Sequence, residues 1–153
     1  MILEAHGITA DLPAGWSGRL FQRTGGVATL HAANFALPLT DGEFGDRSTG
    51  AMPRGGSFLA LTEYRSGPGL KPGTGLFAAK RLPLPLDPSS FARERLAHAR
   101  PGQTGAQHFF TFRGRPFCLY VVLAGERSTR RGQLAELTHV LRTVRIEPHR
   151  GAS

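Results

Sequence analysis

Arginine is the residue type in this chain whose number and placement point most directly to a function. The chain has 153 residues and a formal net charge of +8, and 17 of its 19 basic residues are arginines. Residues 1–64 carry a net charge of −2, whereas residues 65–153 carry +10. Guanidinium groups pair with carboxylates and phosphates, so a charge separation of this size favours an anionic partner. A coding bias toward arginine in a GC-rich genome is the alternative explanation.

Five arginines are grouped at two places where the sequence predicts exposed chain. Arg113 and Arg115 flank a predicted hairpin turn, and Arg127, Arg130 and Arg131 crowd the start of a predicted helix. Positive charge in the first turn of a helix is unfavourable by a few tenths of a kcal/mol per residue, which suggests an anionic counterpart. We therefore predict that these five arginines bind a partner.

Other side chains give little support for catalysis or metal binding. Cys118, the single cysteine, lies in the most apolar run of the chain, which indicates a buried thiol rather than a nucleophile. No two of the six histidines have the spacing that places two imidazoles on one face of an element. The acidic group Asp41, Glu43 and Asp46 lacks the spacing of a calcium loop. No nucleophile elbow, phosphate loop or dinucleotide-binding glycine motif occurs, so we expect no enzyme activity and no cofactor.

The elements that must position these residues are mainly strands, because alternation of apolar and polar residues dominates the chain. Two arms, residues 107–112 and 116–123, flank the short turn Arg113-Gly114-Arg115 and predict a hairpin. The second arm is apolar on both faces, as in a strand that is covered on each side. The other predicted strands are residues 8–12, 16–22, 28–37, 58–64, 76–82 and 143–146.

Two helices are predicted. Asp87 and Pro88 are typical of a helix start, and residues 88–99 continue with apolar side chains at helical spacing. Residues 130–142 carry one apolar stripe, in which Leu134, Leu137, Val140 and Leu141 recur. Hairpin-linked strands with these helices predict a single α+β domain over residues 1–147, with a twisted, mainly antiparallel sheet of about six or seven strands. Residues 148–153 are expected to form a flexible tail.

The order of these elements resembles the Mog1/PsbP-like superfamily, which includes the DcrB-type and Eag-type bacterial proteins. The resemblance depends on an initial strand leading into Leu12-Pro13-Ala14-Gly15-Trp16, on the late hairpin, and on a capped helix running into a short last strand. Members of that superfamily are mostly binding proteins, assembly factors and chaperones. The resemblance therefore implies a non-catalytic role exercised through a surface.

These observations predict a protein-binding or assembly protein: a chaperone, an adaptor or a structural subunit of a larger bacterial complex. The expected partner is another protein, including a secreted or membrane-associated one, and a homo-oligomer is compatible with the sequence. An anion-binding or nucleic-acid-binding module is the alternative, and it is less favoured because basic residues are not interleaved with exposed aromatic ones. Residues 40–56 and 66–75 are further candidate contact loops. No secretory signal or membrane-spanning segment is evident, so a cytoplasmic location is expected.

Overall fold

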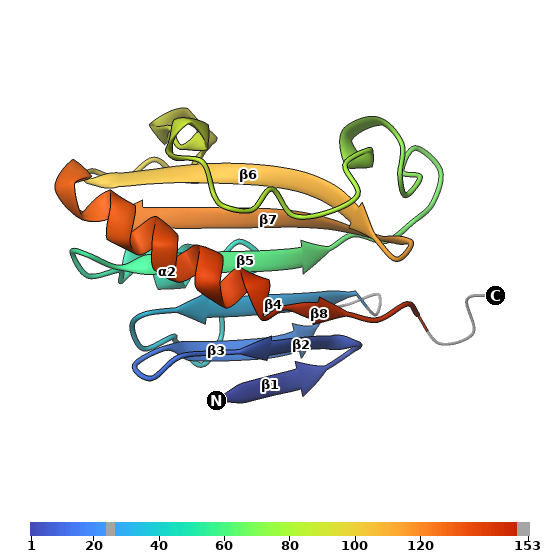
Figure 1. The fold of residues 1–153 in the computed structure, drawn as a ribbon, viewed down its shortest axis with the longest axis horizontal. Coiled ribbons are helices and arrows are strands. Elements are labelled where there is room, and N and C mark those ends of the chain that lie inside the picture. The colour runs from blue at the N-terminus through green and yellow to red at the C-terminus, as the bar shows by residue number, and fades with distance from the viewer. Residues whose placement is uncertain (24–26, 150–153) are drawn as a thin grey trace.

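The computed structural model describes residues 1–23 and 27–149, which form one α+β domain with two antiparallel sheets (Figure 1). The predicted fold class is confirmed, but the described residues contain eight strands in two sheets. The strands are β1 (Ile2–Ala5), β2 (Ile8–Asp11), β3 (Ser17–Gln22), β4 (Ala28–Ala33), β5 (Ser57–Glu63), β6 (Gln103–Phe112), β7 (Arg115–Ala124) and β8 (Arg145–Ile146). The helices are α1 (Asp46–Gly50) and α2 (Arg130–Arg142), and the 3-10 turns are η1 (Gly75–Phe77), η2 (Pro88–Ser90), η3 (Arg93–Arg95) and η4 (Arg127–Thr129).

The larger sheet has the strand order β3-β4-β5-β7-β6. The predicted hairpin is confirmed, and its arms are longer than predicted: β6 and β7 pair from Gln103 opposite Ala124 to Phe112 opposite Arg115. All ten residues of β7 are buried, as its apolar sequence predicted. This sheet is the frame to which the remaining elements attach.

One face of the larger sheet is covered by α2 and by the smaller sheet, whose order is β1-β2-β8 (Figure 1). The predicted apolar stripe of α2 is confirmed, since Leu134, Leu137, Val140 and Leu141 are buried against the sheet. The short strand predicted at residues 143–146 is confirmed as β8, which pairs with β2. No helix in the described part of the chain has the length and apolarity to cross a membrane.

A second, smaller apolar cluster lies on the other face, around Phe58, Tyr120 and Val122. Its cover comes from the chain between β4 and β5, through Phe44 and Met52, and from Leu96 after η3. The strand predicted at residues 28–37 therefore ends at Ala33, because the residues after it leave the sheet to cover this cluster.

The helix predicted over residues 88–99 is wrong. Asp87 does accept a hydrogen bond from the Ser89 backbone and Pro88 follows it, but the chain makes only the single turns η2 and η3. Ala92 lies between them and exchanges two backbone hydrogen bonds with Gly105 of β6. Because β6 is an edge strand with unpaired backbone groups, this pairing with the sheet replaces the hydrogen bonds of a helix.

The strand predicted over residues 76–82 is also wrong. This segment contains η1 and then irregular chain that covers the other end of the β6 edge. The backbone N–H of Thr111 donates to the carbonyl of Ala79, and the Thr111 hydroxyl donates to the carbonyl of Phe77. Prolines 83 and 85, which have no backbone N–H, prevent the segment from extending the sheet any further.

Candidate functional site

Arg115, predicted to bind a partner at the hairpin tip, is an interior residue, and its predicted exposure is wrong. Its side chain is 1% exposed, and its guanidinium makes a two-point ion pair with Glu63, in which Nε and Nη2 each lie 3.0 Å from a carboxylate oxygen. The other N–H groups donate to the carbonyls of His6 and Glu147, at 2.9 Å each. Arg115 points inward because it shares the core-facing side of β7 with Phe117.

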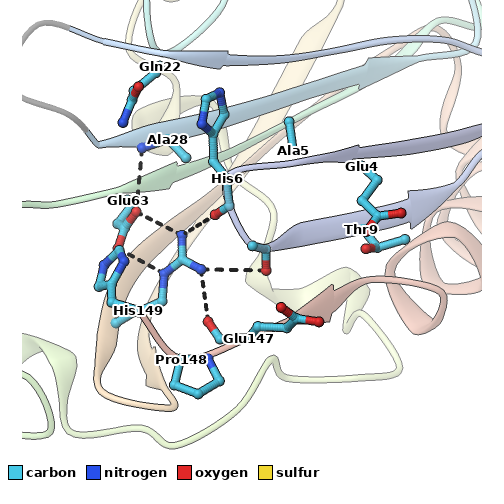
Figure 2. A pocket seen from close by; sticks show the side chains of 12 residues that line it. Glu4, Ala5, His6, Thr9, Gln22, Ala28, Glu63, Glu147, Pro148 and His149 are labelled. Atoms are coloured by element: carbon cyan, nitrogen blue, oxygen red, sulfur yellow. Dashed lines mark hydrogen bonds and ion pairs between the residues drawn. The ribbon is translucent and has the colours of Figure 1, made fainter. Parts of the chain in front are cut away.

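This ion pair forms the floor of a cleft of about 610 Å³ between the two sheets (Figure 2). Nε2 of His149 donates to Glu63 from the open side at 2.7 Å. Burial opposes ionisation of Glu63, but the hydrogen bonds and charge of Arg115, together with His149, hold the pKa of the carboxyl below its usual value. A carboxylate with bound oxygens and a lowered pKa is a poor proton acceptor, so the arrangement joins chain segments rather than performing acid–base chemistry.

His149 belongs to the stretch predicted as a flexible tail. Of that stretch, residues 150–153 lie outside the described residues, whereas His149 contacts Glu63 across the cleft.

The buried thiol and the buried imidazole have no access to a substrate. Cys118 is completely buried, and burial raises its pKa to about 12, in agreement with the sequence interpretation. His31 is 1% exposed and packs edge-on between Phe21 and Phe58, and burial lowers its pKa to about 4. Within residues 1–23 and 27–149, no three histidine, cysteine or acidic side chains are grouped closely enough to hold a metal ion.

A second hollow, here called the main groove, lies where the end of α2 meets β8 and the segment 81–85. Its volume is about 870 Å³. The floor is apolar and consists of Leu82, Leu84, Phe110, Phe112, Leu141, Val144 and Ile146. Four of these side chains are only partly buried by the protein itself: Leu82, Leu84, Phe112 and Val144. The groove therefore presents apolar surface that a ligand would remove from water.

The rim of the main groove is cationic. Arg81, Arg113 and Arg145 line it, and all three are exposed. Arg113 lies over the ring of Phe112 with its guanidinium carbon 5.8 Å from the ring centre, and Arg145 donates to the carbonyls of Arg142 and Val144. None of the three pairs with a carboxylate of the described residues.

The other three arginines of the prediction lie at the opposite end of α2. Arg127 and Arg131 are exposed and Arg130 is half-buried, around the η4 turn and the first turn of the helix. They line a separate hollow of about 470 Å³ together with Phe91 and Leu134. The structure thus divides the five predicted arginines into one buried residue, one at the main groove and three at the far end of the helix.

Sequence reasoning missed Arg81 and Arg145, which line the main groove. Arg81 precedes the proline-rich stretch, which lies beside α2 because the backbone N–H of Leu86 donates to the Thr138 hydroxyl. The exposure of Arg145 could have been predicted, since the alternation in residues 143–146 places this residue on the polar face of the strand. Its convergence with Arg81 and Arg113 depends on tertiary packing.

The two predicted contact loops have different structures. In residues 40–56, the Asp41 carboxylate accepts hydrogen bonds from the backbone of Gly42, Arg47 and Ser48, and this loop covers the second apolar cluster. Residues 66–75 are largely exposed, with one backbone bridge between Gly67 and Leu70. Their role as contact surfaces stays a prediction.

Comparisons of this chain with family models, with curated proteins and with solved structures found no match.

Proposed function

We propose that this protein is a non-catalytic binding protein, a chaperone, adaptor or subunit, that holds an acidic and partly apolar segment of another protein in the main groove. The observation that carries the proposal is the combination of an incompletely buried apolar floor with exposed arginines that have no carboxylate partner among the described residues. A segment with alternating leucine and glutamate side chains satisfies both features at once.

The two features have different energetic roles. Burying a leucine-sized side chain contributes about 1.5–3 kcal/mol, whereas an exposed ion pair contributes about 0.2–1 kcal/mol. The floor therefore supplies most of the affinity. The arginines select acidic partners, orient them and accelerate their association.

The test is the binding of a fluorescent peptide of about eight residues, composed only of glutamate and leucine, measured by anisotropy. We expect Arg81→Glu/Arg113→Glu to weaken binding at least about tenfold, because each reversal replaces an attraction by a repulsion. The matched control is Arg93→Glu/Arg95→Glu, which makes the same charge change in the η3 turn, next to Leu96 on the other face of the sheet. Equal weakening by both variants would refute a specific site.

A substitution in the apolar floor of the main groove distinguishes a protein partner from a nucleic-acid partner. Leu84→Asn removes an apolar contact but no charge, so it should weaken the leucine-containing peptide and leave a single-stranded oligonucleotide unaffected. Tight oligonucleotide binding with a steep salt dependence, together with no effect of Leu84→Asn on the peptide, would replace our proposal by the nucleic-acid alternative.

A further inference from the structure

The main groove is the first of three hollows that follow one another along α2. The next, of about 330 Å³, shares Pro85 with the main groove and is here called the middle hollow. It shares Pro88, Arg131 and Leu134 with the hollow at the start of the helix, here called the far hollow. The shared residues show that the three hollows adjoin one another where residues 81–91 pack beside α2, and the row that they form is here called the track.

One face of α2 forms a wall of this track. Arg131, Ala135, Thr138 and Arg142 line the middle hollow, and their spacing of four, three and four residues places them on one side of the helix. The two arginines are separated by about 16 Å at 1.5 Å per residue. Ala135 and Thr138 lie between them, and the backbone N–H of Leu86 donates to the buried Thr138 hydroxyl at the floor of the hollow, so the track is shallow at its centre and cationic at its two ends.

Among the described residues, no carboxylate of the second half of the chain forms an ion pair with an arginine of this track. Glu126 pairs with Arg54, Glu136 accepts a hydrogen bond from the Trp16 indole, and Asp87 binds the Ser89 backbone. Arg127, Arg130, Arg131 and Arg142 make no side-chain hydrogen bond or ion pair within the described ranges 1–23 and 27–149.

The geometry points to a bound segment that spans the whole track, from Arg113 to Arg127, with acidic side chains at both ends. This inference depends on the proposed function and specifies its partner. Because the Leu86 backbone contacts Thr138 of α2 at 3.2 Å, the segment must lie over this contact and not between the two sides of the track. The 13 residues of α2 and the three of η4 together span about 26 Å, so the segment has about eight residues or more.

The experiment compares two glutamate–leucine peptides, a short one of about five residues and a long one of about twelve. Only the long peptide reaches both ends of the track, so we expect it to bind about tenfold or more tightly than the short one. Arg130→Glu/Arg131→Glu should remove about tenfold of the long peptide's affinity and leave the short peptide's affinity within about twofold. Arg93→Glu/Arg95→Glu again serves as the charge-matched control.

The outcomes separate this inference from the proposed function. If both peptides bind equally and Arg130→Glu/Arg131→Glu affects neither, the track is overturned while the main groove stands. If that variant weakens both peptides alike, the far arginines act only through general charge, and the track is also overturned. If neither peptide binds the unaltered protein, the proposed function itself is refuted. Circular dichroism of each variant confirms that it is folded.

Discussion

Removing the Arg115 side chain should destabilise the protein more than any change at the exposed arginines. Arg115 and Glu63 are 1% and 2% exposed, so Arg115→Met leaves a buried carboxylate whose remaining donors are His149 and the backbone of Ala28. Breaking a buried ion pair from one side typically costs about 3–5 kcal/mol. The exposed arginines of the main groove have no carboxylate partner in residues 1–23 and 27–149, and their removal should change the free energy of unfolding by less than about 0.5 kcal/mol.

A second variant isolates the cause of that cost. In Arg115→Met/Glu63→Leu no charge remains buried, so we expect most of the lost stability to return. Glu63→Gln should cost less than Arg115→Met, because the guanidinium keeps the carbonyls of His6, Gly7 and Glu147 as acceptors.

The pH dependence follows from the lowered pKa of Glu63. Its ionisation stabilises the native protein above the unfolded pKa of about 4.3, and this contribution is lost as the pH falls through the lower native value. In Arg115→Met, the guanidinium no longer opposes the effect of burial, so the native pKa of Glu63 rises. Protonation of Glu63 at low pH then removes the unfavourable buried charge from the variant. The difference in stability between wild type and variant should therefore be largest at neutral pH, begin to shrink as the pH falls through the raised pKa of Glu63 in the variant, and be smallest below its lowered pKa in the wild type.

The assay is urea unfolding followed by far-ultraviolet circular dichroism at a series of pH values. A loss smaller than about 1 kcal/mol at neutral pH, or a loss that does not change in acid, would refute the reasoning. A double variant less stable than Arg115→Met would show that the cleft needs the polar network for packing as well as for charge.

Two further predictions concern the buried thiol and imidazole. Because Cys118 is fully buried and its pKa is raised to about 12, a thiol reagent should not label the native protein at mildly alkaline pH but should label it fully in denaturing urea; rapid labelling of folded protein would contradict the burial. Because the pKa of His31 is lowered to about 4, the unfolded chain binds more protons below about pH 6.5, so native stability should fall by about 3 kcal/mol between that pH and about 4. The stability of His31→Gln should not show this fall between about pH 6.5 and about 4. If the stability of wild type and of His31→Gln changes equally with pH, the prediction is wrong.

The elements predicted correctly were those whose signal is local. In the β6–β7 hairpin and in α2, the repeat of apolar residues is visible within a short stretch of sequence. A two-residue repeat identifies the strands and a 3.6-residue repeat identifies the helix. The helix predicted at residues 88–99 also had a local signal, but Ala92 pairs with Gly105 at the sheet edge instead. This pairing depends on β6, an edge strand that follows later in the chain, so the sequence of residues 88–99 alone does not predict it.

The candidate site was predictable in charge but not in geometry. The sequence identified an excess of arginine in the second half and named Arg113, Arg127, Arg130 and Arg131, all of which line hollows beside α2. The sequence analysis grouped Arg115 with them because Arg113 and Arg115 flank the same turn. The acceptor that takes Arg115 inward is Glu63, 52 residues earlier and on another strand, so its burial follows from strand order and register.

The fold, and not composition alone, determines where the positive charge is left uncompensated. A coding bias fixes how many arginines the chain has, but it does not decide which carboxylates they meet. Here Arg115 of the basic half is neutralised by Glu63 of the acidic half, while Glu126 of the basic half is used by Arg54 of the acidic half. Within the part of the chain that the structure describes, the arginines beside α2 are left without an ion-pair partner, and they lie beside apolar side chains. Repulsion among these arginines destabilises the free protein, and an anionic partner would relieve it, so the arrangement supports the binding role that we propose.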